Sequence, residues 1–152
     1  MRKACTPRHR FADYARLRKA IDVPIAAGEF NDGVLELHAF LDRVALDVLQ
    51  PDTMLVTGVR GAVEVAGRAR EAVVADVPHT WTIGIGFAAN LHVIAAVGSP
   101  WCEFPDEPPW TPAVRDFNLA EPIEVADGEV APPDGPGIDV ERDRDAVATA
   151  AS

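Results

Sequence analysis

Short apolar runs alternate along most of the chain with segments whose apolar positions recur every three or four residues. The apolar runs cover residues 23–27, 46–50, 73–77 and 101–104, and each has the length of a buried strand. The segments of helical period cover residues 11–20, 33–41, 59–69 and 87–96, and Asn31 or Asp32 is expected to cap the second of them. Strands that alternate with helices predict parallel strands, right-handed crossovers and outer helices. The expected fold class is therefore α/β, either an open sheet or part of a barrel.

The pattern changes after the last apolar run. Pro105, Pro108, Pro109 and Pro112 interrupt any regular element, and residues 131–137 form a turn-rich strip. We therefore expect an extended, Pro/Gly-rich C-terminal wrap over residues 105–152, whose last residues, 140–152, form a frayed tail.

Composition and charge restrict the class of protein. The chain has 152 residues, 48% of them hydrophobic, and its 24 acidic and 14 basic residues give a net charge of −10. This length and composition fit one folded domain, and the absence of a basic stripe argues against nucleic acid as a partner. The chain contains neither a signal peptide nor an apolar run long enough to cross a membrane, which favours a cytoplasmic protein. Cys5 and Cys102 lack metal-ligand spacing and are expected to be free thiols.

One titratable residue follows each predicted strand: Glu29, Asp52, His79 and Glu103. The intervals between them each fit one strand, one helix and two loops. Successive parallel strands would therefore deliver all four side chains to one carboxyl-end rim, where (β/α) barrels carry catalytic residues. We expect an Asp52 carboxylate oxygen within hydrogen-bonding distance of a His79 ring nitrogen.

The segments around these residues resemble a known family. Ile25–Glu29, Leu49–Asp52, Val77–His79 and Cys102–Phe104 are similar in order and spacing to the second half of the barrel in the mandelate racemase branch of the enolase superfamily, part of the mandelate racemase/muconate lactonising enzyme family. The resemblance implies a partial (β/α) TIM-type barrel of about four parallel βα units. It divides the chain into an unassigned N-terminal segment at residues 1–10, half a barrel at residues 11–104 and the wrap at residues 105–152.

The same resemblance implies the role of each site residue. Glu29 would be the last of three carboxylate ligands of a magnesium ion, and His79, held by Asp52, would remove the proton alpha to a substrate carboxylate. Glu103 would hydrogen-bond the substrate carboxylate as charge builds on it. Trp81, two positions after His79, would line the substrate pocket, although packing under a loop is an equally good reading.

About half of the family's barrel and its capping domain have no counterpart in this sequence. The two further magnesium carboxylates belong to that half, and residues 1–10 contain no carboxylate where a family strand would end in one. A partner is therefore expected, either a separately encoded N-terminal half or a second copy of the chain.

The resemblance implies an enzyme that acts on a small carboxylate or acid sugar. An acid-sugar dehydratase is the first reading, and a racemase or epimerase of the same branch is the alternative, because both begin with removal of the same proton. A truncated, non-catalytic remnant that keeps the fold and binds no metal is a further alternative. We expect this chain alone to show no turnover of an acid sugar.

Overall fold

Four parallel strands form one sheet in the computed structural model, which describes residues 1–3 and 6–151. In chain order the strands are β1 (Arg2–Lys3), β2 (Ile25–Ala27), β3 (Val48–Leu49) and β4 (Ala75–Asp76), and the order across the sheet is the same. Ala26 pairs with Lys3 on one side and with Val48 on the other. The α/β class predicted from the alternation is confirmed, and Cys5 lies outside the described residues.

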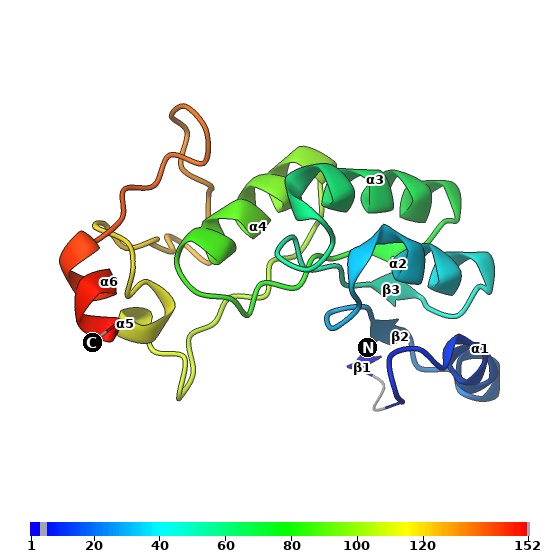
Figure 1. The fold of residues 1–152 in the computed structure, drawn as a ribbon. Helices are drawn as coiled ribbons and strands as arrows, with labels where there is room; N and C mark the ends of the chain where they lie inside the picture. The colour runs from blue at the N-terminus through cyan, green and yellow to red at the C-terminus, as the bar shows by residue number, and fades with distance from the viewer. Residues whose placement is uncertain (4–5, 152) are drawn as a thin grey trace.

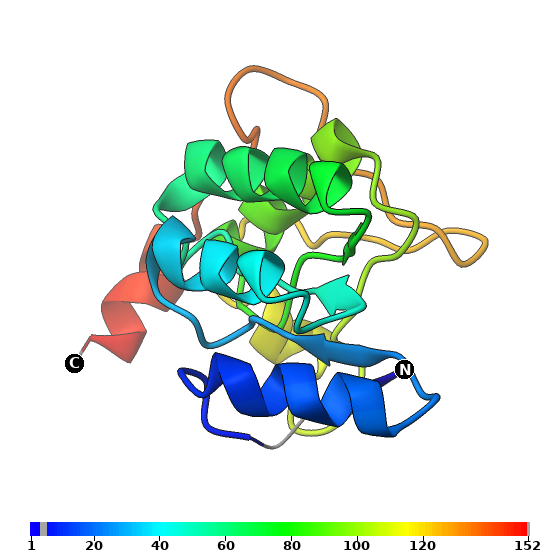
Figure 2. The ribbon, with the colours of Figure 1, turned by 90° about the vertical axis from the view of Figure 1, so that its right-hand side faces the viewer.

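Each pair of neighbouring strands is connected through a helix. The helices are α1 (Phe11–Ala20), α2 (Gly33–Asp42) and α3 (Gly58–Glu71), and α4 (Ile85–Val97) follows the last strand. Helix α3 packs against both α2 and α4. Figure 2 shows α1, α2 and α3 ranked one above the other, in the order of the strands that they connect. This is the arrangement of successive βα units, in which every crossover runs in the same direction.

The main core lies between the sheet and these helices. Its largest members are fully buried side chains of β2, α2, the loop before β3, β3 and α3: Ile25, Leu37, Phe40, Leu46, Leu49 and Val65. The Phe40 ring is met edge-on by Phe11 and Tyr14 of α1, at centroid distances of 4.8 and 5.0 Å. Edge-to-face contacts of this kind add to the burial of the rings themselves. Because the strands are only two or three residues long, it is this packing that holds them in place.

The predicted strand at residues 101–104 is wrong, because no strand forms there. The segment lies between Pro100 and Pro105, neither of which has an N–H to donate, so a ladder here could not extend beyond these four residues. Side chains fasten it instead: Gln50 donates to the Glu103 carboxylate, and the Thr80 hydroxyl donates to the Glu103 carbonyl. The fourth strand of the sheet is β1, within the segment that the sequence left unassigned.

The wrap contains two short helices where only extended chain and a frayed tail were expected (Figure 1). Helix α5 (Pro112–Arg115) begins with a proline, whose missing N–H would have no partner in a first turn anyway. Helix α6 (Arg144–Ala150) is capped by Asp143, which accepts from the backbone N–H groups of Asp145 and Ala146. At α2 the expected position of the cap is right, but the Asp32 side chain makes no cap bond; it pairs with Arg8 instead.

No helix in the part of the chain that the structure describes is both long enough and apolar enough to span a lipid bilayer.

Two helices end in a turn that favours glycine but contains valine. After α3, Val73 has φ 57°, its N–H bonds to the Arg70 carbonyl, and the Val74 N–H bonds to the Ala69 carbonyl. Val44 ends α2 in the same way with φ 50°. This pair of bonds is the Schellman motif, whose left-handed residue is usually glycine because a Cβ atom clashes there.

We expect Val73→Gly to stabilise the protein by about 1 kcal/mol, because it relieves the left-handed strain and the side chain, 93% exposed, gives up no packing. Urea denaturation measures the change. Val63→Gly, within α3, is the matched control and should destabilise by about 1 kcal/mol. Equal effects of the two substitutions would show that the turn is not strained.

Asp76, at the end of β4, is a buried carboxylate for which no hydrogen-bond partner is found among the described residues. Burial raises its pKa from 3.8 to about 7, and the charge of Arg70 offsets only part of that shift. The folded chain therefore holds a proton here that the unfolded chain releases at lower pH. Folding stability is unaffected by this group below pH 3.8 and falls as the pH rises from there to about 7.

Asp76→Val should make the free energy of unfolding depend less on pH, because the buried carboxylate is removed. The urea midpoint of the natural chain should be lower at pH 8 than at pH 5 by more than that of the variant. Asp42→Asn, which changes an exposed carboxylate, serves as the control. A midpoint difference that survives in Asp76→Val would assign the pH effect to another group.

Candidate active site

The loops after β2, β3 and β4 carry the site. Glu29, Asp52 and His79 each follow one of these strands closely, so they emerge at the same edge of the sheet. Glu103 reaches the same place from the extended segment after α4. The structure thus brings together the four residues that the sequence singled out; their chemical roles remain predictions.

Asp52 and His79 form a buried pair. The Nδ1 atom of His79 lies 3.1 Å from an Asp52 carboxylate oxygen, and both side chains are almost fully enclosed. Burial acts to raise the Asp52 pKa, but the hydrogen bonds from His79, the Met54 N–H and Asn90 outweigh it and lower the pKa below 3.8. Asp52 therefore stays ionised, and it favours the His79 tautomer that carries its proton on Nδ1.

Asn90 connects this pair to helix α4 through hydrogen bonds. Its amide nitrogen donates to the second Asp52 oxygen at 3.2 Å, and its amide oxygen accepts from the Thr53 N–H at 2.9 Å. The Asn90 side chain is fully buried, so both groups would be without water if the contacts were lost. The helix thus fixes the loop that positions Asp52.

Glu29 and Glu103 share one cation, the ammonium group of Lys3. The Lys3 Nζ atom lies 2.5 Å from Glu29 Oε2 and 3.0 Å from Glu103 Oε1. Gln50 donates to the same Glu103 oxygen at 2.9 Å. Burial acts to lower the Lys3 pKa, but the two carboxylates outweigh it and hold the pKa above 10.5. Lys3 reaches the carboxylates from β1, which pairs directly with β2.

The free nitrogen of His79 faces Glu29. Its Nε2 atom lies 3.9 Å from Glu29 Oε2, and part of the His79 side chain is accessible at the rim. A histidine held at Nδ1 by a carboxylate presents an unprotonated Nε2 atom, which can take a proton from a bound molecule. The chemistry available here is general-base catalysis next to a pair of carboxylates.

The described residues do not make a complete magnesium site by themselves, and the resemblance assigns only one of the three carboxylate ligands, Glu29, to this chain. Magnesium requires near-octahedral oxygen coordination. Within residues 1–3 and 6–151 no group of three or more acidic, histidine or cysteine side chains is arranged to hold a metal ion. Glu29 and Glu103 are the nearest candidates, and Lys3 lies between them.

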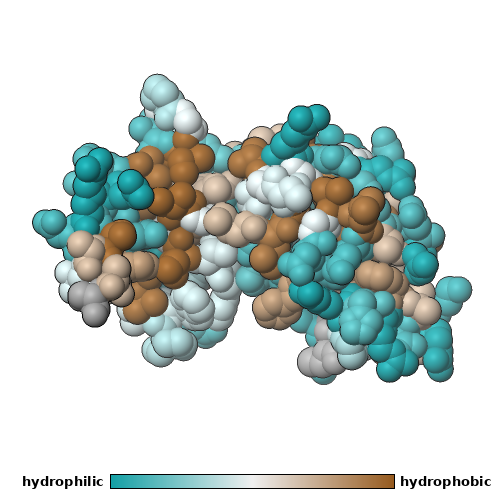
Figure 3. Space-filling view, viewed as in Figure 1, coloured by the Kyte–Doolittle hydropathy of each residue, from teal (hydrophilic) through white to brown (hydrophobic). Residues whose placement is uncertain are grey.

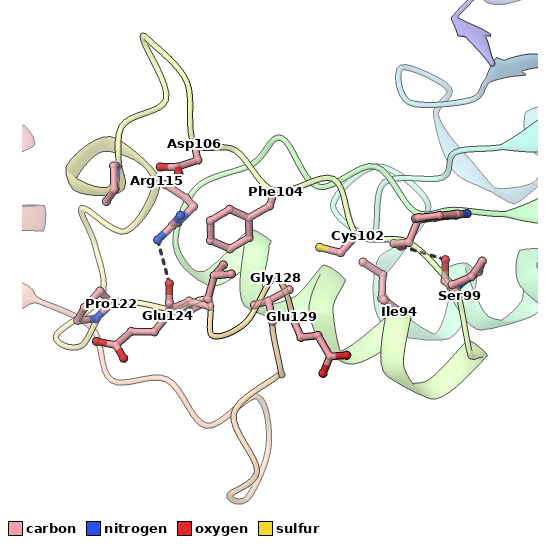
Figure 4. Close-up of a pocket in the computed structure, with 16 residues that line it drawn as sticks. Ile94, Ser99, Cys102, Phe104, Asp106, Arg115, Pro122, Glu124, Gly128 and Glu129 are labelled. Carbon is pink, nitrogen blue, oxygen red and sulfur yellow. Dashed lines mark hydrogen bonds between the residues drawn. The ribbon is translucent and has the colours of Figure 1, made fainter.

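A separate hollow of about 850 Å³ lies between the end of α4 and the wrap, and none of the four site residues lines it. Arg115 is its most conspicuous polar group, but Figure 4 shows the guanidinium beside the Phe104 ring and bonded to a backbone carbonyl rather than free in the cavity. Asp116 takes two further bonds from it. Arg115 is therefore satisfied by the wrap itself, and the hollow carries no sign of a reactive site.

Trp81 lies on the loop after His79. Its ring meets that of Trp110, from the wrap, at a centroid distance of 6.1 Å. This contact ties the His79 loop to the wrap, and a role of Trp81 in binding substrate remains a prediction.

Sequence reasoning overlooked Lys3 and Gln50 as members of the site and gave Asn90 no role. Residues 1–10 contain no carboxylate, and it is Lys3, in β1, that reaches the site from this segment. A glutamine inside an apolar run just before Pro51 was the available signal for Gln50.

A sequence model described as "Enolase C-terminal domain-like" matches residues 4–146. The chain is 36% identical over 144 residues to D-galactarolactone cycloisomerase of Agrobacterium fabrum, covering 88% of this chain and 37% of that protein. It is 32% identical over 124 residues to arabinonate dehydratase of Saccharolobus solfataricus, covering 82% of this chain and 32% of that protein.

Solved structures agree with this likeness. The crystal structure of 3,6-anhydro-D-galactonate cycloisomerase from Zobellia galactanivorans superposes with a TM-score of 0.85 at 26% identity, covering 97% of this chain and 41% of that one. An enolase of an alphaproteobacterium, BAL199, described with bound magnesium, gives a TM-score of 0.77 at 28% identity, covering 97% of this chain and 38% of that one. The chain spans well under half the length of each of these relatives.

Asn90→Leu should destabilise the protein by about 2–3 kcal/mol, because it leaves the buried Thr53 N–H without its partner and removes one of the two donors of Asp52 Oδ1, which keeps only the Met54 N–H. Urea denaturation at neutral pH measures this change. Ala95→Gln, at an exposed position of the same helix, should be neutral. A loss below about 0.5 kcal/mol for Asn90→Leu would mean that water replaces the amide and that the pair is not fixed by α4.

Proposed function

The chain belongs to the enolase C-terminal domain-like family, and we propose that it forms the His79-bearing part of an acid-sugar dehydratase. In this proposal the His79 Nε2 atom removes the proton alpha to the carboxylate of a sugar acid. The observation that carries it is the buried Asp52–His79 contact of 3.1 Å, which leaves the other ring nitrogen directed at the rim.

The residues around His79 have distinct tasks in this reaction. Asp52 orients the ring and stabilises the imidazolium that forms when the proton arrives. The same histidine can then protonate the departing beta hydroxyl, which completes the loss of water. Glu103, held by Gln50, is the group proposed to hydrogen-bond the substrate carboxylate. Asp52 is a positioning residue, whereas His79 reacts.

The names of the curated relatives favour dehydration over racemisation, because they are a cycloisomerase and a dehydratase of sugar-acid compounds. A racemase or epimerase would use the same first step and remains the alternative. Any magnesium ion in the complete enzyme would need carboxylates from outside this chain.

The rim of the site supports a role for a further segment or partner that covers it. Phe30, directly after Glu29, is 64% exposed, and Met54, two residues after Asp52, is 58% exposed. Figure 3 shows further apolar areas on the surface. Apolar side chains exposed at the mouth of a site are typical of surfaces that another segment covers. A separately encoded N-terminal half, a longer chain and a second copy each meet this need.

A chimera tests the proposal. The N-terminal part of arabinonate dehydratase from Saccharolobus solfataricus, joined to this chain in place of the matching C-terminal third, should convert a sugar acid to its 2-keto-3-deoxy product and exchange the alpha hydrogen in D₂O. His79→Asn in that chimera should lower both rates by about 10²- to 10⁴-fold, because the general base is gone. This chain alone should give no turnover.

His38→Asn, which changes a histidine of α2 outside the site, is the control and should keep the rate of the chimera. Exchange that persists in His79→Asn would place the base elsewhere. Turnover by this chain alone at millimolar magnesium would contradict the need for further carboxylates.

A further inference from the structure

We infer that Lys3 is a resident cation of the site, which holds Glu29 and Glu103 together and excludes a divalent cation from the space between them. The inference concerns the ionic state of the site. It does not depend on His79 being a base, so it stands or falls separately from the proposed function.

The first support is the geometry of the two contacts. The Lys3 Nζ atom lies within 3.0 Å of an oxygen from each carboxylate, and these two oxygens belong to side chains 74 positions apart in sequence, at residues 29 and 103. A single ammonium group thus bridges the segment after β2 and the segment after α4. A divalent cation coordinated by the same two carboxylates would have to occupy nearly the same point.

The second support is the balance of charge. Glu29, Asp52 and Glu103 bring three carboxylates to one rim. Asp52 is satisfied by its own donors, whereas Glu29 and Glu103 would repel each other without a cation between them. Both are four-fifths buried, with 20% of each side chain exposed, so solvent screens that repulsion only in part. Lys3 supplies the positive charge.

The third support is that backbone pairing fixes where Lys3 stands. Lys3 pairs with Ala26 in the parallel ladder, and the Arg2 N–H bonds to the Pro24 carbonyl. The side chain therefore starts from a set position beside the strand that leads to Glu29. The other lysine of the chain, Lys19, lies at the exposed end of α1. It provides a matched control for every measurement.

Binding of Mn²⁺ to the purified chain, followed by the electron paramagnetic resonance signal of the free ion, tests the exclusion. Mn²⁺ prefers the same oxygen ligands as Mg²⁺. Lys3→Met keeps the aliphatic stem and removes the charge, and it should tighten Mn²⁺ binding by about tenfold or more, because a competing and repelling charge is lost. Lys19→Met should leave binding unchanged. Glu29→Gln added to Lys3→Met should abolish the gain.

Carbodiimide coupling tests the contact in the unmodified chain, so the inference does not rely on the variant folding. An amine in contact with a carboxylate should form an amide with loss of one water, and peptide mass spectrometry should find Lys3 joined to Glu29 or Glu103, with no such product from Lys19. Absence of both Lys3 products would overturn the inference. Mn²⁺ binding that is equal in the unmodified chain and Lys3→Met would overturn it as well.

Discussion

The site depends on one constraint: the four strands are parallel and follow one another in space in the order of the sequence. Every strand therefore ends at the same edge, and the loops after β2, β3 and β4 bring Glu29, Asp52 and His79 to it. The ladders themselves are too short to impose this order. Helices packed on the sheet impose it, through a core in which Phe40, Leu49 and Val65 are fully buried. The position of each site residue at the strand ends is thus a consequence of the packing between the sheet and its helices.

The strands bring the loops to one edge, and electrostatic interactions then determine how the side chains of these loops pair. Three carboxylates in a partly buried place are costly unless each finds donors or a cation. Asp52 is satisfied by Asn90, the Met54 N–H and His79. Glu29 and Glu103 share the Lys3 ammonium, which contacts Oε2 of Glu29 and Oε1 of Glu103, whereas the Oε2 atom of Glu103 is buried without a hydrogen-bond partner among the described residues. The site is therefore two networks, one that fixes a histidine and one that joins two carboxylates, and the 3.9 Å approach of His79 to Glu29 connects them.

The alternation of apolar runs predicted the fold class and three of the four strands, because burial imposes a period on local sequence. It failed for residues 101–104, whose apolar content favours a strand but which are held by hydrogen bonds from Gln50 and Thr80 to Glu103 instead of by a ladder. It also missed β1, because Arg2 and Lys3 are polar residues of an exposed strand. The in-phase spacing predicted that Glu29, Asp52, His79 and Glu103 meet at one rim. Lys3, Gln50 and Asn90 join them through contacts between distant segments, which no local pattern records.

The polar strand β1 has two roles: it forms an edge of the sheet, and it carries Lys3 of the candidate site. Among the described residues β1 pairs only with β2, so its other side offers free backbone groups. Short, charged edge strands resist further pairing, and β1 has two residues, both basic. Neighbouring residues of a strand point to opposite faces. The charge of Arg2 therefore discourages pairing at this edge, whereas the charge of Lys3 lies in the site. A partner that extends the sheet at β1 would therefore pair with a basic edge, and a cation bound by Glu29 and Glu103 would compete with the Lys3 ammonium. At this edge, extension of the sheet and binding of a cation would therefore involve the same strand.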